Sequence, residues 1–435
     1  MRRSPPASHG PAARLRAHPA RGHVRQDRIF DAVAQVAARE GYARLTVERI
    51  IATAGVSRAT FYQYFANVDE CFRGAYRHHA EVLIADVTAA AGVAEQRELA
   101  VLEALVATAA ARPDAASLLM REGLAAGPLG LRERDALISA IERVMTCARP
   151  AHRTLDLPPA IAIGGLFRFL SMSLCDGSTL DGLSAEVRQW AVAFARQAWS
   201  ESWSAKFAPA FPDRTPMADA THTRPRQQAS ARERILHATA ATICAKGYRD
   251  ITVADIVRIA GVSRRGFYNL FHGKADAFAA AYERGFQQTL AACTPAFFVS
   301  ADWPERVWHS AHAFTSVMAR EPLTAYLGFV ECHAPGPGFA PRMHDTQLAF
   351  TLFLEEGYRQ RPQAQSLPRT CSALTATAIF ELGFEVSRHG PSLLMRCMQP
   401  LAVYIALAPF IGRDEAGEFV SGRLFGESSD APAAA

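Results

Sequence analysis

The stretch AGVSRATFYQYF occupies residues 54–65, and a close copy, AGVSRRGFYNLF, follows 206 positions later at residues 260–271. Around it, residues 41–65 and 247–271 share thirteen identical residues in twenty-five. Weaker matches continue further along the chain, where Leu157-Pro158 corresponds to Leu367-Pro368 at an offset of 210. The duplication therefore covers two units of roughly two hundred residues each, and not only a short motif.

Composition divides the chain into segments. Residues 206–230 lose all hydrophobic periodicity and contain four prolines, which is typical of a linker. The linker ends at Ser230-Ala-Arg-Glu233, a capping box that starts a new helix. The expected order is a disordered basic arm (1–26), a small helical domain (27–72), a larger helical domain (73–205), the linker (206–230), a second small domain (231–278), a second larger domain (279–426) and a disordered tail (427–435).

The net charge of +5 is a local feature. Residues 1–30 contain seven arginines and one aspartate, so this arm carries +6 and the rest of the chain sums to −1. Such an arm is either a solvated tail or a segment that follows a groove of nucleic acid.

The eight cysteines stand singly, without a CxxC pair, which favours reduced thiols over disulfides or a zinc site. Cys332-His333 is the one adjacent pair of soft ligands, and we expect no metal and no cofactor. The longest apolar run, residues 400–412, is too short to cross a bilayer. These features predict a soluble, cytoplasmic protein.

Residues 46–65 read as two short helices joined by a sharp turn. Thr46 and Ser57 can cap the helices, and Gly55 supplies a backbone conformation that other residues adopt only at a cost. Phe61 and Phe65 are spaced to bury one face of the second helix. Helix, glycine turn and helix form the helix-turn-helix layout, whose second helix enters the major groove of DNA. Convincing β alternation is absent, so the chain is predicted to be all-α.

Both copies resemble the N-terminal DNA-binding domain of the TetR/AcrR family of bacterial transcriptional regulators, through the run Thr-Val-x-x-Ile-x-x-x-Ala-Gly-Val-Ser-Arg-x-x-Phe-Tyr-x-x-Phe. The resemblance implies two tandem units, each with a three-helix DNA-binding domain followed by a helical domain that binds a ligand and dimerises. In the first unit, the residues that it implies contact DNA are Thr46, Ser57, Arg58, Ala59, Thr60, Tyr62, Gln63 and Tyr64. In the second unit they are Thr252, Ser263, Arg264, Arg265, Gly266, Tyr268, Asn269 and Lys274.

The sequence departs from the family pattern at two positions. The lysine that the family usually places after the recognition helix is kept as Lys274, whereas the first copy has Val68. Gly266 weakens the second recognition helix by about 0.5–1 kcal/mol relative to alanine. Whether both copies bind DNA with equal strength is left open.

The two larger domains differ in aromatic content. Residues 81–159 contain no aromatic residue, whereas residues 286–358 of the second unit contain twelve. A pocket for a small hydrophobic effector is therefore expected in the second unit. Its candidate lining residues are Trp308, Tyr326, Phe329, Glu331, Phe350, Phe353, Glu381 and Phe384.

The resemblance implies a cytoplasmic, nucleoid-associated repressor that binds double-stranded operator DNA and is released by its effector. The family's dimerisation helices correspond to residues 158–176 with 183–203 and 368–388 with 391–411. Because all four lie in one chain, we expect an intramolecular pseudo-dimer on an asymmetric operator, and homodimerisation of chains stays open. An enzyme is disfavoured because no phosphate-binding glycine loop, HExxH or GxSxG occurs. A ligand-independent architectural or partner-binding scaffold is the alternative.

Overall fold

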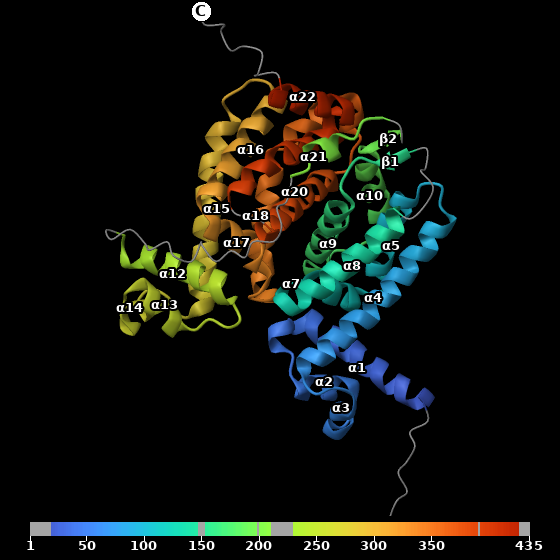
Figure 1. The fold of residues 1–435 in the computed structure, drawn as a ribbon, viewed down its shortest axis with the longest axis vertical. Helices are drawn as coiled ribbons and strands as arrows, with labels where there is room; N and C mark the ends of the chain where they lie inside the picture. The colour runs from blue at the N-terminus through green and yellow to red at the C-terminus, as the bar shows by residue number, and fades with distance from the viewer. Residues whose placement is uncertain (1–18, 147–152, 198–199, 210–228, 390–391, 426–435) are drawn as a thin grey trace, which may run out of the picture.

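The structure is a computed structural model that describes residues 19–146, 153–197, 200–209, 229–389 and 392–425. It consists almost entirely of helices, arranged in two units (Figure 1). The first unit, blue to green, lies on the right and lower side in Figure 1, and the second, yellow to red, lies on the left and upper side.

The first unit begins with a small domain and continues into a larger one. The small domain contains α1 (Pro19–Glu40), η1 (Tyr42–Arg44), α2 (Val47–Ala54) and α3 (Arg58–Tyr64). The larger domain contains α4 (Val68–Val93), α5 (Arg97–Ala111), α6 (Pro113–Ser117), the π-helical turn η2 (Leu118–Glu122), α7 (Gly123–Ala125), α8 (Pro128–Thr146), β1 (Arg153–Leu155), α9 (Pro159–Cys175), α10 (Leu183–Val192), β2 (Ala195–Gln197) and α11 (Trp203–Phe207).

The second unit repeats this order. Its small domain contains α12 (Ala231–Lys246), α13 (Val253–Ala260) and α14 (Arg264–Tyr268). Its larger domain contains α15 (Lys274–Phe297), α16 (Trp303–Arg320), α17 (Pro322–Phe329), η4 (Glu331–His333), η5 (Pro337–Phe339), α18 (Ala340–Thr351), η6 (Glu355–Arg359), α19 (Pro362–Gln365), α20 (Thr370–His389), η7 (Ser392–Met398), α21 (Gln399–Ile411) and α22 (Arg413–Phe425).

The predicted caps and turns shape both helix-turn-helix segments. The hydroxyl of Ser57 accepts the backbone N–H of Thr60 at 3.1 Å, and Ser263 accepts that of Gly266 at 3.0 Å. Gly55 ends α2 with a φ of 62°, and Gly261 ends α13 with the same φ. This left-handed conformation is the one that favours glycine, so each turn is fixed by a glycine followed by a serine cap.

The hydrophobic interior joins the two units. One continuous core includes the first small domain and parts of both larger domains, with Tyr76, Phe167, Phe384 and Tyr404 among its buried rings. The second small domain packs a separate core around Phe267 together with Leu327 of α17. The first small domain is thus built into the common core, whereas the second is attached to its own larger domain.

The two units meet where α9 crosses α20 (Figure 1). A Cβ atom placed on Gly165 of α9 would lie 2.7 Å from the Cα of Ala378 on α20, so only a glycine permits this approach. Beside the crossing, Glu381 of α20 accepts hydrogen bonds from Arg134 of α8 at 2.7 Å and from Arg168 of α9 at 2.6 Å. All three charged side chains are buried, so the ion pairs lie inside the contact between the units.

A second contact joins the ends of the units. The buried carboxylate of Asp156 accepts the hydroxyls of Tyr404 at 2.9 Å and of Ser204 at 2.9 Å. Helix α11 continues this contact, because Phe207 packs on Tyr404 with a ring separation of 6.0 Å. The start of the predicted linker therefore belongs to a helix that packs on the second unit.

Several boundaries differ from the prediction. Helix α1 begins at Pro19, inside the predicted arm 1–26, because proline is favoured in the first turn of a helix. Helices α4 and α15 run unbroken through the boundaries predicted at 72/73 and 278/279. The short pair β1–β2, with Thr154 opposite Arg196, interrupts the all-α pattern. Residues 1–18, 210–228 and 426–435 of the predicted arm, linker and tail lie outside the described residues.

The apolar stretch near the C-terminus is longer than predicted. The eighteen residues Leu394–Ile411 are long and apolar enough to cross a membrane, because η7 and α21 form one apolar run. However, 78% of this window is buried inside the protein, as expected for a core helix.

Candidate nucleic-acid interface and ligand pocket

The first recognition face is the outer side of α3. Phe61 is fully buried, while Arg58, Ala59 and Gln63 are exposed and Tyr62 is 51% exposed. Thr60 and Tyr64 are partly covered. The face therefore presents a cation, a phenol and a side-chain amide, which suit phosphate contacts and the reading of an adenine edge.

The cation on this face already has a partner. The guanidinium of Arg58 forms an ion pair with Glu48 on α2, and both side chains are exposed. The backbone N–H of Glu48 and the nearby Arg58 lower the pKa of this carboxyl, so it stays ionised. A phosphate that binds Arg58 must compete with Glu48.

The second recognition face carries more free positive charge. Arg264, Arg265 and Asn269 are exposed on or after α14, and Tyr268 is 52% exposed. Arg258 on α13 is also exposed, at the position that corresponds to Ala52. Among the residues that the structure describes, none of these three arginines pairs with a carboxylate, and Arg264 has no counterpart of the Glu48 partner because position 254 holds alanine.

The remaining predicted DNA contacts are mainly structural in this conformation. Thr46 and Thr252 cap α2 and α13, and both are exposed. Gly266 is partly covered, and α14 ends at Tyr268, two residues earlier than the matching end of α3 at Tyr64. The ammonium of Lys274 donates to the carbonyls of Tyr248, Arg249 and Ile251 at 3.0–3.1 Å. All three of its donors are engaged, so the predicted phosphate contact requires the loss of one of these bonds.

One protein family matches both helix-turn-helix segments. The family of bacterial regulatory proteins named tetR matches the chain twice, at residues 29–75 and 235–281. The chain carries two tandem TetR-type units. No curated protein matches it. A crystal structure of a TetR-family transcriptional regulator from Syntrophomonas wolfei is 18% identical, with a TM-score of 0.32 over 47% of this chain and 98% of that chain.

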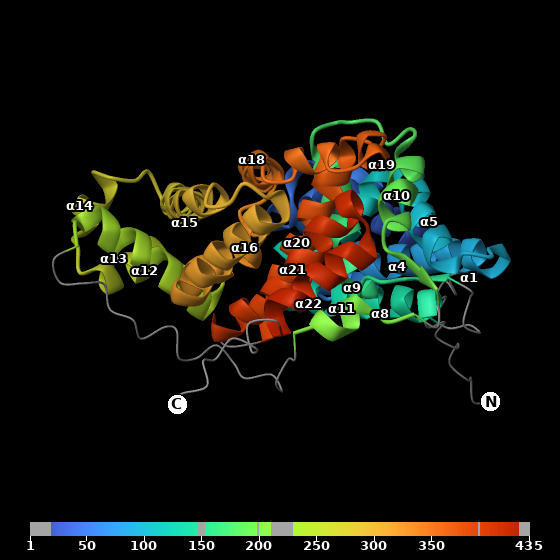
Figure 2. The ribbon, with the colours of Figure 1, turned by 90° about the horizontal axis from the view of Figure 1, so that it is seen from above.

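The two TetR-type DNA-binding domains project from different parts of the molecule. Figure 1 shows α12–α14 at the lower left and α1–α3 at the bottom. In the view from above, α12–α14 stand out at the left end of the protein (Figure 2).

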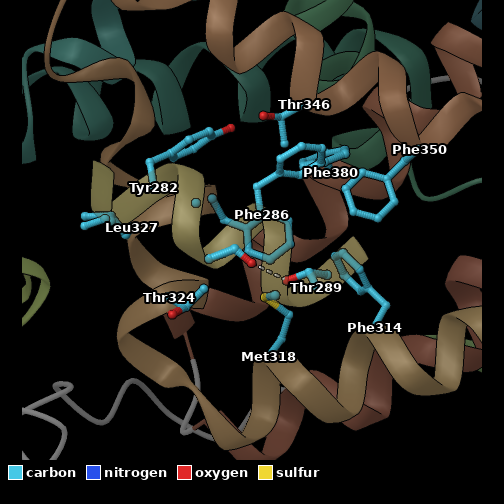
Figure 3. A pocket seen from close by; sticks show the side chains of 14 residues that line it. Tyr282, Phe286, Thr289, Phe314, Met318, Thr324, Leu327, Thr346, Phe350 and Phe380 are labelled. Carbon is cyan, nitrogen blue, oxygen red and sulfur yellow. Dashed lines mark hydrogen bonds between the residues drawn. The ribbon is translucent and has the colours of Figure 1, made fainter. Parts of the chain in front are cut away.

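The larger domain of the second TetR-type unit contains an apolar pocket between α15, α16, α17, α18 and α20 (Figure 3). It encloses about 430 Å³ of empty space up to its opening and is lined by Tyr282, Phe286, Phe314, Met318, Phe329 and Phe380, among others. Thr289, Thr324 and Thr346 supply hydroxyls, of which that of Thr289 donates to the carbonyl of Gly285 at 2.8 Å. The pocket suits a hydrophobic molecule with few polar groups.

A second apolar pocket adjoins the first. It encloses about 670 Å³ up to its opening, between α16, α20 and α21. Phe314, Phe350 and Phe380 line both pockets and form the wall between them. The Phe350 ring lies 5.4 Å from that of Phe314 and 5.7 Å from that of Phe380, so rotation of a few side chains would join the two spaces.

The structure corrects the predicted set of ligand residues. Phe329, Phe350 and Phe353 line one or both pockets, but Trp308, Tyr326, Glu331, Glu381 and Phe384 line neither. Glu381 and Phe384 instead belong to the contact between the units, where the guanidinium groups of Arg134 and Arg168 lie over the Phe384 ring at 5.1 and 4.9 Å. Helical periodicity predicts that these residues are buried, but not which neighbour covers them.

Glu331 has a different role from the predicted one. Its carboxylate accepts the backbone N–H of Tyr248, directly after α12, at 3.0 Å. The matching Glu122 of η2 accepts the N–H of Tyr42 at 2.6 Å. In each unit, therefore, one glutamate carboxylate, buried in Glu122 and partly buried in Glu331, joins the larger domain to its DNA-binding domain.

The environments of these two carboxylates differ. Arg121 pairs with Glu122 at 2.5 Å and also donates to the carbonyl of Ala38 on α1 at 2.8 Å. The residue before Glu331 is Val330, so no such cation is present there, and burial raises the pKa of Glu331.

The Cys332-His333 pair is not arranged as a metal site. Burial raises the pKa of the Cys332 thiol to about 12, and burial and the neighbouring arginines lower the pKa of His333. His333 Nε2 lies 3.0 Å from an Nη atom of Arg168. Among the described residues, no group of three potential ligands could hold a metal ion.

Proposed function

We propose that this protein is a transcriptional repressor that binds operator DNA as an intramolecular pseudo-dimer and is released by a small hydrophobic effector. The observation that carries the proposal is the pair of exposed recognition faces on α3 and α14, each set by a serine cap and a glycine turn. The buried crossing of α9 and α20 supports pairing within one chain.

The effector site proposed is the aromatic pocket of the second unit. Leu327, Gly328 and Phe329 of α17 line this pocket, and Glu331 follows two residues later with its bond to Tyr248. A ligand that displaces Phe329 shifts the segment that holds the second DNA-binding domain. Because a ligand changes an equilibrium only through its different affinities for two states, release requires that the effector favour the shifted arrangement.

The test begins with selection of DNA sequences from a random pool by the full chain, with and without cell extract. Sequence-specific binding that an apolar fraction of the extract weakens supports both parts of the proposal. Binding without sequence preference, unaffected by extract, favours the scaffold function instead.

A matched pair of variants tests whether the effector binds in this pocket. A Cβ atom at Gly328 would meet no atom within 4 Å, so Gly328→Trp should fill the pocket, abolish release by the active fraction and leave operator affinity within about twofold. Gly422 on α22 is exposed and has equally open space, so Gly422→Trp should leave release intact. If Gly328→Trp still responds, the effector binds elsewhere.

A further inference from the structure

The side chain of Arg249 connects the two DNA-binding domains in the part of the chain that the structure describes. Arg249, in the loop after α12, donates to the phenol oxygen of Tyr42 at 3.0 Å, and its guanidinium lies 5.0 Å from the centre of the Tyr42 ring. The Tyr42 hydroxyl donates to Asp69 at 2.8 Å, and Arg249 lies 4.0 Å from the same carboxylate. Arg249, Tyr42 and Asp69 are called the bridge below.

Both ends of the bridge are anchored. Tyr42 is only 3% exposed, its ring packs on Phe72 at 4.6 Å, and its backbone is held by Glu122. Burial, with the bond to Asp69, raises the pKa of Tyr42 to about 12, so the phenol keeps the proton that it donates. On the other side, Lys274 binds the carbonyl of Arg249 itself at 3.0 Å and so orders the loop.

The two copies have diverged in a matched way at these positions. Arg249 corresponds to Ala43, Asp69 to Ala275, and Lys274 to Val68. The donor and its support therefore occur only in the second unit, and the acceptor carboxylate occurs only in the first. Two identical units facing each other could not form this contact.

We infer that the bridge fixes the separation of the two recognition helices and thereby selects the number of base pairs between the half-sites of the operator. The inference rests on the proposed DNA-binding function. One added base pair moves a half-site by about 3.4 Å and turns it around the DNA helix axis. Two recognition helices held at a fixed separation therefore fit only one spacing of the half-sites. Arg249 acts here as a positioning residue, since it contacts Tyr42 and not the bases.

The first experiment needs no DNA. Labels are attached without cysteine chemistry at Thr53 and Ile259, matching exposed positions of α2 and α13, and the distribution of distances between them is measured in the full chain. Arg249→Ala should broaden the distribution, and Arg249→Lys should broaden it less. Arg265→Ala, which removes an exposed arginine outside the bridge, should not change it. An unchanged distribution in Arg249→Ala overturns the inference, whether or not the protein binds DNA.

The second experiment measures affinity for a selected operator and for versions with one or two base pairs added or removed between its half-sites. The unaltered protein should lose about fivefold or more at each wrong spacing, and Arg249→Ala should reduce this discrimination. Arg265→Ala should weaken binding at every spacing by the same factor. Equal discrimination in Arg249→Ala and the unaltered protein overturns the role in spacing, whereas absence of specific binding by any variant refutes the proposed function.

Discussion

At the scale of single residues, the two recognition faces differ most at one position. Arg265 stands where the first unit has Ala59, and both side chains are exposed. An arginine can bind the O6 and N7 atoms of guanine together, whereas an alanine methyl can contact only the methyl group of thymine. Arg265 of the second face can therefore recognise a guanine, whereas Ala59 at the matching position of the first face cannot.

Replacement of Arg265 by alanine should relax the preference for a guanine in one half-site, by about 1–3 kcal/mol, and leave the other half-site unchanged. Binding of operators with single base changes, measured by fluorescence anisotropy, checks this result. Arg58→Ala and Tyr62→Phe are the controls, because the loss of a phosphate contact weakens binding to all sequences alike. A loss of preference in both half-sites would refute the assignment.

The matching carboxylates Glu122 and Glu331 should respond differently to the same change. Glu122→Gln leaves Arg121 buried without its carboxylate, so the free energy of unfolding should fall by about 3 kcal/mol. Glu331→Gln keeps an oxygen that can accept from Tyr248 and removes a partly buried charge that has no neighbouring cation. It should therefore leave stability at neutral pH unchanged or higher.

The titration of Glu331 should make the stability of the protein depend on pH. Burial raises its pKa in the folded protein, so its contribution favours folding at acid pH and is lost as the pH rises through the folded pKa. Urea unfolding at several pH values should show a shallower decline of stability with rising pH in Glu331→Gln. An unchanged slope would mean that Glu331 does not titrate in this range.

The sequence predicts some of these residues and not others. The caps Ser57 and Ser263, the glycine turns and the buried Phe61 and Phe267 follow from local spacing, because their partners lie within a few residues. The bonds of Glu122 and Glu331 span 80 and 83 residues, and no local pattern indicates them. Their one signal is the repeat itself, in which the two glutamates correspond at an offset of 209, three residues more than the offset of the Gly-Tyr pair.

At the scale of elements, the close approach of α9 and α20 holds the two units together. Gly165→Leu should disturb this crossing, because even a Cβ atom there would lie 2.7 Å from Ala378. When residues 1–209 and 229–435 are produced as separate chains, they should associate, and Gly165→Leu should weaken that association by about 1–3 kcal/mol. Calorimetric titration of one chain with the other checks both statements.

The matched control for this prediction is Gly92→Leu. Gly92 lies exposed on α4 with no atom within 4 Å of a Cβ, so the same substitution there should leave the association unchanged. Equal effects at the two glycines would show that the crossing does not hold the units together. The aromatic content predicts that an aromatic pocket lies in the second unit, but the helices that line such a pocket become clear only from the packing of α15, α16, α17, α18 and α20.

At the scale of the whole molecule, the duplicated chain combines similar folds with unlike surfaces. The first unit has charged pairs in its interior and is built into the common core, whereas the second holds the aromatic pockets and a separately packed DNA-binding domain. We therefore expect an effector in the second unit to act on the second DNA-binding domain first and to reach the first through the contact between the units.

The operator should be asymmetric for the same reason. A homodimer reads a palindrome because its recognition helices are identical, and operator symmetry mirrors protein symmetry. Here one helix presents Ala59 and Gln63 and the other presents Arg265 and Asn269, while the bridge of Arg249 can form only between unlike units. Sequences selected by the full chain should thus contain two unlike half-sites about one helical turn, or a small multiple of it, apart.

Gln63→Ala should alter selection in one half-site and Asn269→Ala in the other, and each variant serves as the control for its counterpart. Selection of a perfect palindrome would contradict this arrangement, because it requires two chains that pair through like units.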